Sequence, residues 1–338
     1  MKKSTFLGVL AATALVAGAA GATTLDDIKA RGVVNCGSNT GLTGFGAPDA
    51  DGNYQGFDVD ICKAIAAAIF GDQTKVKYIP TTGETRFTAL ASGEVDLLVR
   101  NSTWTYSRDT DLKLDFVAVN YYDGQGFMVK KDLGVSSAKE LDGATVCIQT
   151  GTTTELNLAD FFKANNITYT PVTVADDADA QRQFLAGACD AFTTDASGLA
   201  ASRATLPNPA DYIILPEIIS KEPLGPVVRH GDNQWGDIVR WTYYALVAAE
   251  EKGITKANIE EVATSTTDPE VKRLLGVEGD MGKMLGLDNA WAKNAIAANG
   301  NYGEIFETNI GASTPIGLAR GLNALWTQGG LQYSPPFR

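Results

Sequence analysis

The stretch RFTALASGEVDLLV (Arg86–Val99) decides the fold, because a second stretch, RQFLAGACDAFTTDAS (Arg182–Ser197), repeats its order of features. In each stretch a helical pattern ends at a glycine, Gly93 or Gly187, and a short apolar run follows that leads into polar residues. Alternating helices and strands predict mainly parallel sheets, and such folds bind ligands beyond the carboxyl ends of their strands. The two units therefore predict an α/β protein with two lobes that face each other.

The surrounding sequence predicts further elements of the same kind. GFDVDICKAIAAAIFG (Gly56–Gly71) places apolar residues at helical spacing and ends in a glycine, which predicts a helix. A second helix is predicted at about 178–186, before Gly187. Strands are predicted at 33–36, 75–80, 95–99 and 189–193.

Two extended runs interrupted by glycine and proline flank the second unit: DFVAVNYYDGQGFMVK (Asp115–Lys130) and KEPLGPVVRH (Lys221–His230). We interpret them as two crossing strands that form a hinge, so that the second lobe is inserted in the first. The predicted domains are a signal peptide at 1–22, a first lobe made of 23–119 and 224–338, and a second lobe at 120–223. A largely helical region ends the chain.

The chain opens with MKKSTFLGVLAATALVAGAAGA, which has the two lysines, the short apolar run and the small final residues of a cleaved secretory signal. The apolar run is too short to span a bilayer, and no later stretch approaches a membrane span. We therefore expect a soluble periplasmic protein. Without the two lysines of the signal, the chain has 26 of its 28 basic residues and 40 acidic residues, which gives a net charge of −14. Because no basic cluster is present, nucleic acid is a poor candidate partner.

The four cysteines, Cys36, Cys62, Cys147 and Cys189, are even in number and lie in a chain predicted to be exported, so disulfides are expected. Three pairings are possible. We favour Cys36 with Cys62 and Cys147 with Cys189, because each pair lies in one region of the sequence. A zinc site is the alternative, but close C-x-x-C pairs are lacking and His230 is the one histidine. No metal or cofactor is predicted.

A free amino acid needs a guanidinium and N–H groups for its carboxylate, and a carboxylate for its ammonium group. Arg108 supplies a planar, permanently charged fork in the polar loop that follows the first strand of the repeat. Asp195, at the corresponding place after the second strand, can pair with an ammonium group. Each residue alone also fits an ordinary role, as a surface ion pair or a helix cap.

A second candidate for anion binding lies in CIQTGTTTELNLADFF (Cys147–Phe162). Thr152 and Glu155 have the spacing of a capping box, which predicts the start of a helix. The N–H groups of Thr153 and Thr154 would then be free to hold an anion, although ordinary capping explains the motif equally well.

Together these features resemble the periplasmic polar amino-acid-binding proteins that serve ATP-driven importers, solute-binding protein family 3. The resemblance covers nearly the whole predicted mature chain. The length of the chain, its cysteines and the motif RNSTWT are most similar to the subgroup that binds general L-amino acids. It implies a type II two-lobe fold and a ligand bound in an interlobe cleft. It is carried by the motifs GFDVDICKAIA, RFTALASGEVDLL, NSTWTYSRDTDLKLDF, LDGATVCIQTGTTTE, CDAFTTD and NGNYGEIF.

The resemblance also implies roles for single residues. Arg108 would hold the ligand carboxylate, with N–H groups donated by Thr103 and Thr153. Asp195, the Asn101 carbonyl and the Thr103 hydroxyl would hold the ammonium group. Because Arg108 belongs to the predicted first lobe and Asp195 to the second, the ligand would draw the lobes together.

The pocket for the ligand side chain is less defined by the resemblance. Many relatives place an aromatic residue where Leu42 lies, and Phe45 or Trp104 could replace it here. Asn39 stands where binders of basic amino acids have an acidic residue, which argues against lysine or arginine as the preferred ligand. Arg86 and Arg100 could reach an acidic or amide side chain. The candidate side-chain pocket comprises Asn39, Arg86, Arg100, Trp104, Thr154 and Thr194.

The predicted function is capture of free L-amino acids, with broad specificity and a leaning to acidic and amide side chains, for an inner-membrane ABC permease. We expect a monomer that is not an enzyme: nucleophile and metalloprotease motifs are lacking, and His230 has no nucleophile beside it. Two alternatives remain open. One is an amino-acid sensor that a chemotaxis receptor recognises, and the other is an enzyme of related fold such as a cyclohexadienyl dehydratase, with Glu84 as a candidate carboxylate.

Overall fold

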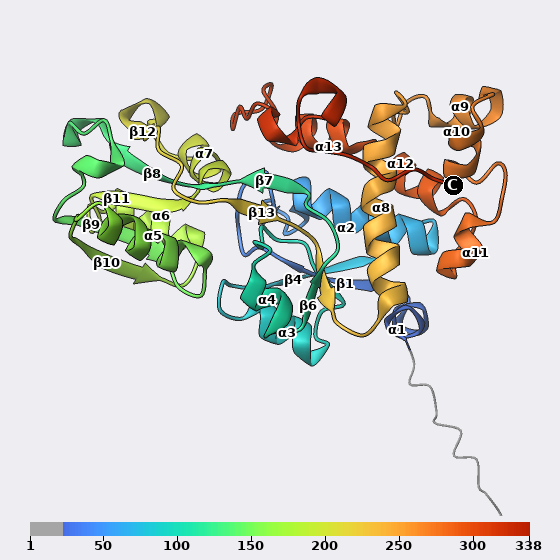
Figure 1. Cartoon of the computed structure of the whole chain (residues 1–338), viewed down its shortest axis with the longest axis horizontal. Coiled ribbons are helices and arrows are strands. Elements are labelled where there is room, and N and C mark those ends of the chain that lie inside the picture. Colours follow the sequence, from blue (N-terminus) through green and yellow to red (C-terminus); the bar gives the residue numbers. More distant parts are fainter. Residues whose placement is uncertain (1–22) are drawn as a thin grey trace, which may run out of the picture.

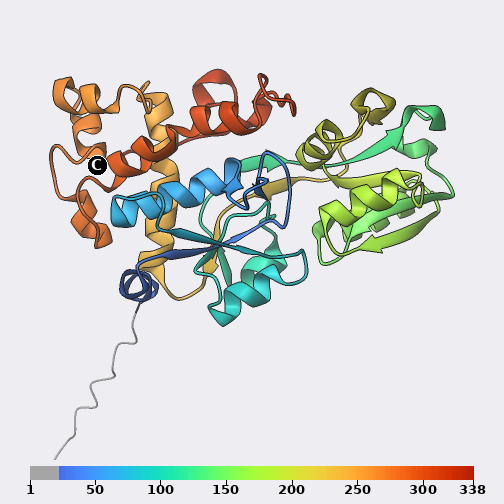
Figure 2. The same ribbon diagram turned by 180° about the vertical axis from the view of Figure 1, so that it is seen from behind.

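The computed structural model describes residues 23–338, so the predicted signal peptide lies outside the described residues. Two lobes, each built on one five-stranded sheet with helices packed against it, lie side by side and are joined by extended segments (Figure 1). The view from behind shows that the C-terminal helices all belong to the side of the first lobe (Figure 2). The prediction of an α/β fold with two lobes is confirmed.

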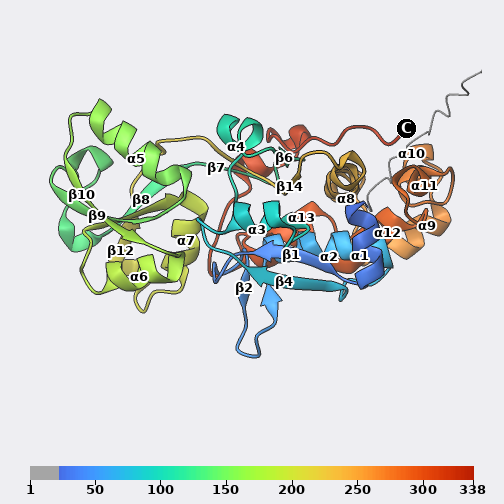
Figure 3. The same ribbon diagram turned by 90° about the horizontal axis from the view of Figure 1, so that it is seen from below.

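The sheet of the first lobe draws its strands from both ends of the chain. Its order is β4 (Val76–Pro80), β1 (Val34–Ser38), β5 (Leu97–Leu98), β14 (Val227–Arg229) and β6 (Leu114–Phe116). A small hairpin of β2 (Ala47–Pro48) and β3 (Tyr54–Gln55) projects from this lobe (Figure 3). Its first helices are α1 (Thr24–Arg31), α2 (Phe57–Phe70), α3 (Arg86–Ser92) and α4 (Tyr106–Thr110).

The sheet of the second lobe repeats this plan with one continuous part of the chain. Its order is β10 (Tyr169–Val174), β9 (Ala144–Gln149), β11 (Ala191–Asp195), β8 (Gln125–Lys130) and β12 (Tyr212–Ile214). Its helices are α5 (Thr153–Ala164), α6 (Asp177–Leu185) and α7 (Ala196–Ala204).

Both sheets are mixed rather than mainly parallel, which corrects the prediction. In each sheet the three strands linked by crossover helices are parallel: β4, β1 and β5 in the first, and β10, β9 and β11 in the second. The other two strands pair antiparallel. The reason is that β8 and β14 enter their sheets directly from the crossing segments, without the helix that a parallel neighbour requires.

The two crossing strands are confirmed as β7 (Tyr121–Asp123) and β13 (Glu222–Leu224), which pair antiparallel between the lobes. They lie beside the predicted domain limits. The exact limits, 23–119 with 224–338 and 120–223, stay a prediction.

The predicted helices form within a few residues of their expected bounds. α2 ends at Gly71, which adopts the left-handed conformation that a side chain would oppose. The strand predicted at 95–99 is shorter, and before it the Val95 N–H donates to the Ala89 carbonyl of α3 instead of to a neighbouring strand. The strand predicted at 189–193 lies two residues later and ends at Asp195 itself.

Both predicted disulfides are present. Cys36–Cys62 joins β1 to α2 in the first lobe, and Cys147–Cys189 joins β9 to the segment before β11 in the second. Each lobe therefore has one crosslink of its own, as the regional pairing of the cysteines predicted.

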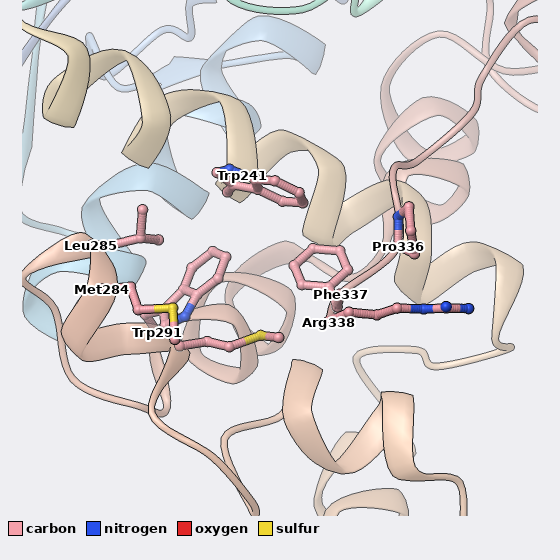
Figure 4. Close-up of a pocket in the computed structure, with 8 residues that line it drawn as sticks. Trp241, Met284, Leu285, Trp291, Pro336, Phe337 and Arg338 are labelled. Atoms are coloured by element: carbon pink, nitrogen blue, oxygen red, sulfur yellow. The ribbon is translucent and has the colours of Figure 1, made fainter.

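The helical C-terminal region packs on the first lobe and enlarges its core. The long helix α8 contributes Trp235, Tyr243 and Leu246 to that core, and Ile296 and Phe306 come from later helices. Where the chain ends, Trp241, Trp291 and Phe337 line an apolar pocket (Figure 4). The region comprises α8 (Asn233–Glu251), α9 (Ile259–Ser265), α10 (Pro269–Leu274), α11 (Met281–Leu285), α12 (Trp291–Asn299) and α13 (Tyr302–Asn309).

Candidate functional site

Polar side chains follow the carboxyl ends of the parallel strands in both lobes and meet between them. We call the group of Arg86, Arg100, Arg108, Asp177, Asp195 and Glu222 the interlobe site. All six side chains are buried. Three are guanidinium groups from the first lobe and three are carboxyl groups from the second lobe or the crossing strand β13. The arrangement can hold a ligand that carries both signs of charge.

Arg108 lies on α4 and is 8% exposed. Its Nη1 donates to the Thr103 carbonyl at 2.9 Å, and its guanidinium lies 4.8 Å from the centre of the Phe87 ring. Burial lowers the pKa of Arg108 to about 10, although the charges of Glu222 and Asp195 act in the opposite direction. A group with that pKa stays cationic at pH 7, so it can pair with a carboxylate.

Glu222, which the sequence analysis missed, connects Thr103 and Thr153, the two residues predicted to donate N–H groups to the ligand carboxylate. The Thr153 hydroxyl donates to its carboxylate at 2.9 Å, and the Thr103 hydroxyl donates to the same oxygen. The Thr103 and Thr153 hydroxyl oxygens lie 3.5 Å apart, although they come from different lobes. In the stretch KEPLGPVV, the sequence around Glu222 predicted only a crossing strand. Its contact with the two threonines depends on the pairing of β13 with β7.

The start of α5 is as predicted, but the capping box does not form. Thr152 occupies the N-cap position, yet its hydroxyl donates to the Gln149 carbonyl at 2.7 Å. Glu155 accepts from the Gly151 N–H at 2.9 Å instead of from Thr152. Because the Thr152 side chain caps none of the first N–H groups of α5, those groups are available to an anion.

Asp195 is the last residue of β11 and the N-cap residue of α7, but its side chain makes no cap hydrogen bond. Burial raises the pKa of Asp195 well above its usual range, and the charges of Asp123 and Glu222 raise it further. Asp123 at the end of β7 accepts a hydrogen bond from the Ser197 hydroxyl, and burial raises its pKa to about 6. An ammonium group beside Asp195 would offset this crowding of negative charge.

Asn101 lies between Arg86 and Asn39 at the interlobe site. Arg86 Nη1 lies 3.4 Å from the Asn101 carbonyl oxygen, and Asn39 Nδ2 lies 3.2 Å from Asn101 Oδ1. Asn101 has a positive φ of 29°, and its N–H donates to the buried carboxylate of Asp58 at 3.1 Å. Burial raises the pKa of Asp58 to about 6. Asp58 was not predicted, because it lies within an otherwise apolar helical pattern.

The lobes are in direct contact around this site. Asn39 Nδ2 donates to Asp177 Oδ2 at 3.3 Å, and Arg86 Nη2 donates to the Gly151 carbonyl at 3.5 Å. A Cβ atom at Gly83 would lie 2.6 Å from the Thr150 carbonyl oxygen, so the backbones themselves meet here. The structure therefore has a closed arrangement in which residues far apart in sequence form one site.

Several predicted side-chain contacts lie elsewhere. Trp104 is 42% exposed, stacks on Phe116 and donates from its indole to Asp109, so the structure does not bring it into the interlobe site. Phe45 packs edge to face against Phe57 and Tyr121 in the core of the first lobe.

The predicted threonines of the second lobe lie close to Gln125. Gln125 Nε2 donates to the Thr154 carbonyl at 3.2 Å and to the Thr193 hydroxyl. Thr194 is the next residue of β11 after Thr193. Both threonines are buried, and Gln125 Oε1 has no hydrogen-bond partner in the described part of the chain. The polar core of the second lobe thus extends from Gln125 toward Asp195.

The described residues offer no group of three or more His, Cys, Asp and Glu side chains that could hold a metal ion. Within residues 23–338, no helix is both long and apolar enough to cross a bilayer.

The model of the bacterial extracellular solute-binding proteins, family 3, matches residues 34–274. The chain belongs to this family. Members of this family are extracellular solute-binding proteins. The residues after 274, including α11 to α13, lie beyond the matched range.

Three relatives cover the described chain almost completely. The glutamate/glutamine/aspartate/asparagine-binding protein BztA of Rhodobacter capsulatus is 79% identical over 338 residues, which is all of both chains. The general L-amino acid-binding periplasmic protein AapJ of Rhizobium johnstonii is 60% identical over 342 aligned positions, again with full coverage of both. A periplasmic binding protein from Brucella ovis, solved with glutathione bound, is 56% identical with a TM-score of 0.91 and covers 94% of this chain and 100% of its own.

Proposed function

We propose that this protein captures free L-amino acids between its lobes, in the periplasm, and delivers them to an inner-membrane ABC permease. The proposal includes broad specificity with a preference for acidic and amide side chains. It assigns the ligand carboxylate to Arg108 and to the N–H groups of Thr103 and Thr153. It assigns the ammonium group to Asp195, the Asn101 carbonyl and the Thr103 hydroxyl.

One observation carries the proposal: the buried guanidinium of Arg108 and the buried carboxyl group of Asp195, which makes no cap hydrogen bond, belong to opposite lobes, and the charge of Asp195 raises the pKa of Arg108. Such a pair matches the two charges that every free amino acid carries. The Glu222 carboxylate, which binds the hydroxyls of Thr103 and Thr153, holds the donors of both lobes in register. Constant contacts to the common backbone of the ligand allow the side chain to vary.

The relatives support both parts of the proposal. One is named for glutamate, glutamine, aspartate and asparagine, and another for general L-amino acids. The glutathione in the Brucella ovis protein contains a γ-glutamyl group with a free amino-acid end, which has the same carboxylate and ammonium pair. All three are described as binding proteins, so we propose that this chain binds and releases its ligand unchanged, as a monomer.

Isothermal titration calorimetry of the mature protein with each common L-amino acid tests the proposal. We expect one site per chain, binding of L-amino acids, and recovery of chemically unchanged ligand. Binding should also raise the melting temperature with increasing ligand concentration. Wild-type protein, freed of co-purified ligand by unfolding and refolding, that binds none of these amino acids would refute the proposal.

A further inference from the structure

Arg100 is a buried cation without direct partners. It is 2% exposed, and its Nε and Nη1 atoms have no hydrogen-bond partner among residues 23–338. Burial of a guanidinium without hydrogen bonds is costly, and protein interiors rarely retain it without a reason. Arg320, another largely buried arginine, shows the ordinary solution, because it pairs with both carboxylate oxygens of Glu250.

The sheet register places Arg100 at the interlobe site. β1 and β5 pair in parallel with Gly37 beside Leu98, so Asn39 and Arg100, two positions later, leave neighbouring strand ends together. Asn39 Nδ2 in turn donates to the Asp177 carboxylate across the lobes. Arg100 therefore lies near the start of α6, where Asp177 is the carboxylate that acts on it most strongly.

The charges around Arg100 leave room for one more anion or carbonyl. Burial lowers the pKa of Arg100, and the carboxylates of Asp177, Asp58 and Asp195 offset part of that cost. Asp58 already accepts hydrogen bonds from the Asn101 N–H and Asn120 Nδ2. None of these carboxylates accepts a hydrogen bond from Nε or Nη1 of Arg100.

We infer that Arg100, opposed across the lobes by Asp177, selects ligands whose side chain ends in a carboxylate or carboxamide oxygen. This inference rests on the proposed function. With the ligand backbone held between Arg108 and Asp195, the side chain extends toward Arg100, whose free N–H groups can donate to the oxygen of either group. An apolar side chain leaves them unpaired, which costs affinity.

Asp177 distinguishes the two classes of ligand. As a carboxylate it accepts from the N–H₂ of a carboxamide but repels a second carboxylate. The groups that face it are Arg100, Arg86, Asn39, Asp195 and its neighbour Asp176. Burial raises the pKa of Asp177. Protonated Asp177 can donate to an acidic ligand, so one site accepts both acids and amides.

The test compares L-glutamine with L-norvaline, which ends in a methyl group where glutamine has its carboxamide. Wild-type protein should bind glutamine at least about 10-fold more tightly, and Arg100→Met should reduce that ratio by about 10-fold or more, as expected for a hydrogen bond to a charged group. Arg320→Met, a matched buried arginine outside the site, should leave the ratio unchanged. An unchanged ratio in Arg100→Met, or no preference in wild type, would overturn the inference.

Two further readouts keep the result interpretable. Arg100→Lys, which keeps the charge and should preserve the fold if Arg100→Met does not, should also reduce the ratio, because it loses the planar fork. Asp177→Asn should raise the affinity for glutamate relative to glutamine by about 10-fold, since it removes a repelling charge; no change would contradict the role of Asp177. Wild-type protein that binds neither glutamine nor norvaline would refute the proposed function itself.

Discussion

The two halves of the interlobe site carry opposite charges. The first lobe contributes Arg86, Arg100 and Arg108, whereas the second lobe and the crossing strand β13 contribute Asp177, Asp195 and Glu222, with Asp123 of β7 beside them. Burial lowers the pKa of the three arginines and raises that of the three aspartates, so each half disfavours its own charged state. We propose that closure brings the halves together and that a zwitterion between them satisfies both.

The same comparison predicts that one half alone would bind an amino acid weakly. In the first lobe, Arg108 has a carbonyl and an aromatic ring as partners, and it needs an acceptor to complete its hydrogen bonds. In the second lobe, Asp195 lies near Asp123 and Glu222 and needs a cation. A ligand that binds only one half gains nothing from closing the lobes, since differential affinity for the closed form is what drives closure.

The largest expected effect comes from removing either charge of the clamp. Arg108→Ala and Asp195→Ala should each lower the affinity for L-glutamate at least about 100-fold, because each leaves a ligand charge buried without its partner. Titration calorimetry measures the loss. Arg182→Ala, on the exposed face of α6, is the control and should bind like wild type. Near-normal affinity in either clamp variant would disprove the assigned pocket.

A smaller effect is expected from Glu222→Gln, which changes the connection between the halves. The amide keeps the shape of Glu222 but weakens the hydrogen bonds donated by Thr103, Thr153 and Asn157. We expect affinity to fall about 10-fold, the cost of replacing charged by neutral hydrogen bonds. Small-angle scattering should show a larger share of open molecules at subsaturating ligand. Equal affinity and compaction would mean that Glu222 does not govern closure.

The pH dependence tests the carboxylate half alone. Because the pKa of Asp195 is raised in the folded protein, its protonated form stabilises the unliganded site at low pH, and this contribution is lost as pH rises through that pKa. The ligand ammonium requires the carboxylate, so binding releases a proton and affinity falls as pH falls, by at most about 10-fold per unit. Calorimetry with L-glutamine, whose carboxamide requires no proton on Asp177, in buffers of different ionisation enthalpy measures the released proton. Proton uptake on binding would contradict the assignment.

The smallest difference concerns the disulfides of the two lobes. Cys36–Cys62 has a sequence separation of 26 and Cys147–Cys189 one of 42. Loop-closure entropy predicts a loss of about 3.5 kcal/mol of unfolding free energy without the first and about 4 kcal/mol without the second. Denaturant unfolding of the two paired Cys→Ser variants measures both losses. A gap much larger than about 0.5 kcal/mol would show that strain or residual structure outweighs loop entropy.

Much of the fold was predictable from local patterns. Helical spacing from Phe57 to Ile69, with Gly71 after it, predicted α2, and the repeated helix and strand units predicted the two lobes. The direction of β8 and β14 was not predictable from those patterns. It depends on the crossing strands entering each sheet without a helix, which is a property of the connection rather than of the strand.

The candidate site was predictable in part for a similar reason. Arg108 and Asp195 follow strand ends in the sequence, and strand ends are where α/β folds bind ligands. Glu222 carried no such mark, since it lies in a crossing strand, and Asp177 follows β10, a strand that the sequence analysis did not predict. Trp104 looked suitable from its loop, but packing on Phe116 and a hydrogen bond to Asp109 direct it elsewhere.

By itself the sequence determined the two α/β lobes, the disulfide pairs and the strand ends that present Arg108 and Asp195. Periodicity, glycine stops and cysteine spacing act between residues close together in the chain, so they can be recognised without coordinates. The tertiary structure alone decided that Glu222 joins Thr103 to Thr153, that Asn39 meets Asp177, and that Arg100 is buried without partners. These relations depend on which strand ends face each other when the lobes close, and no local pattern encodes that distance.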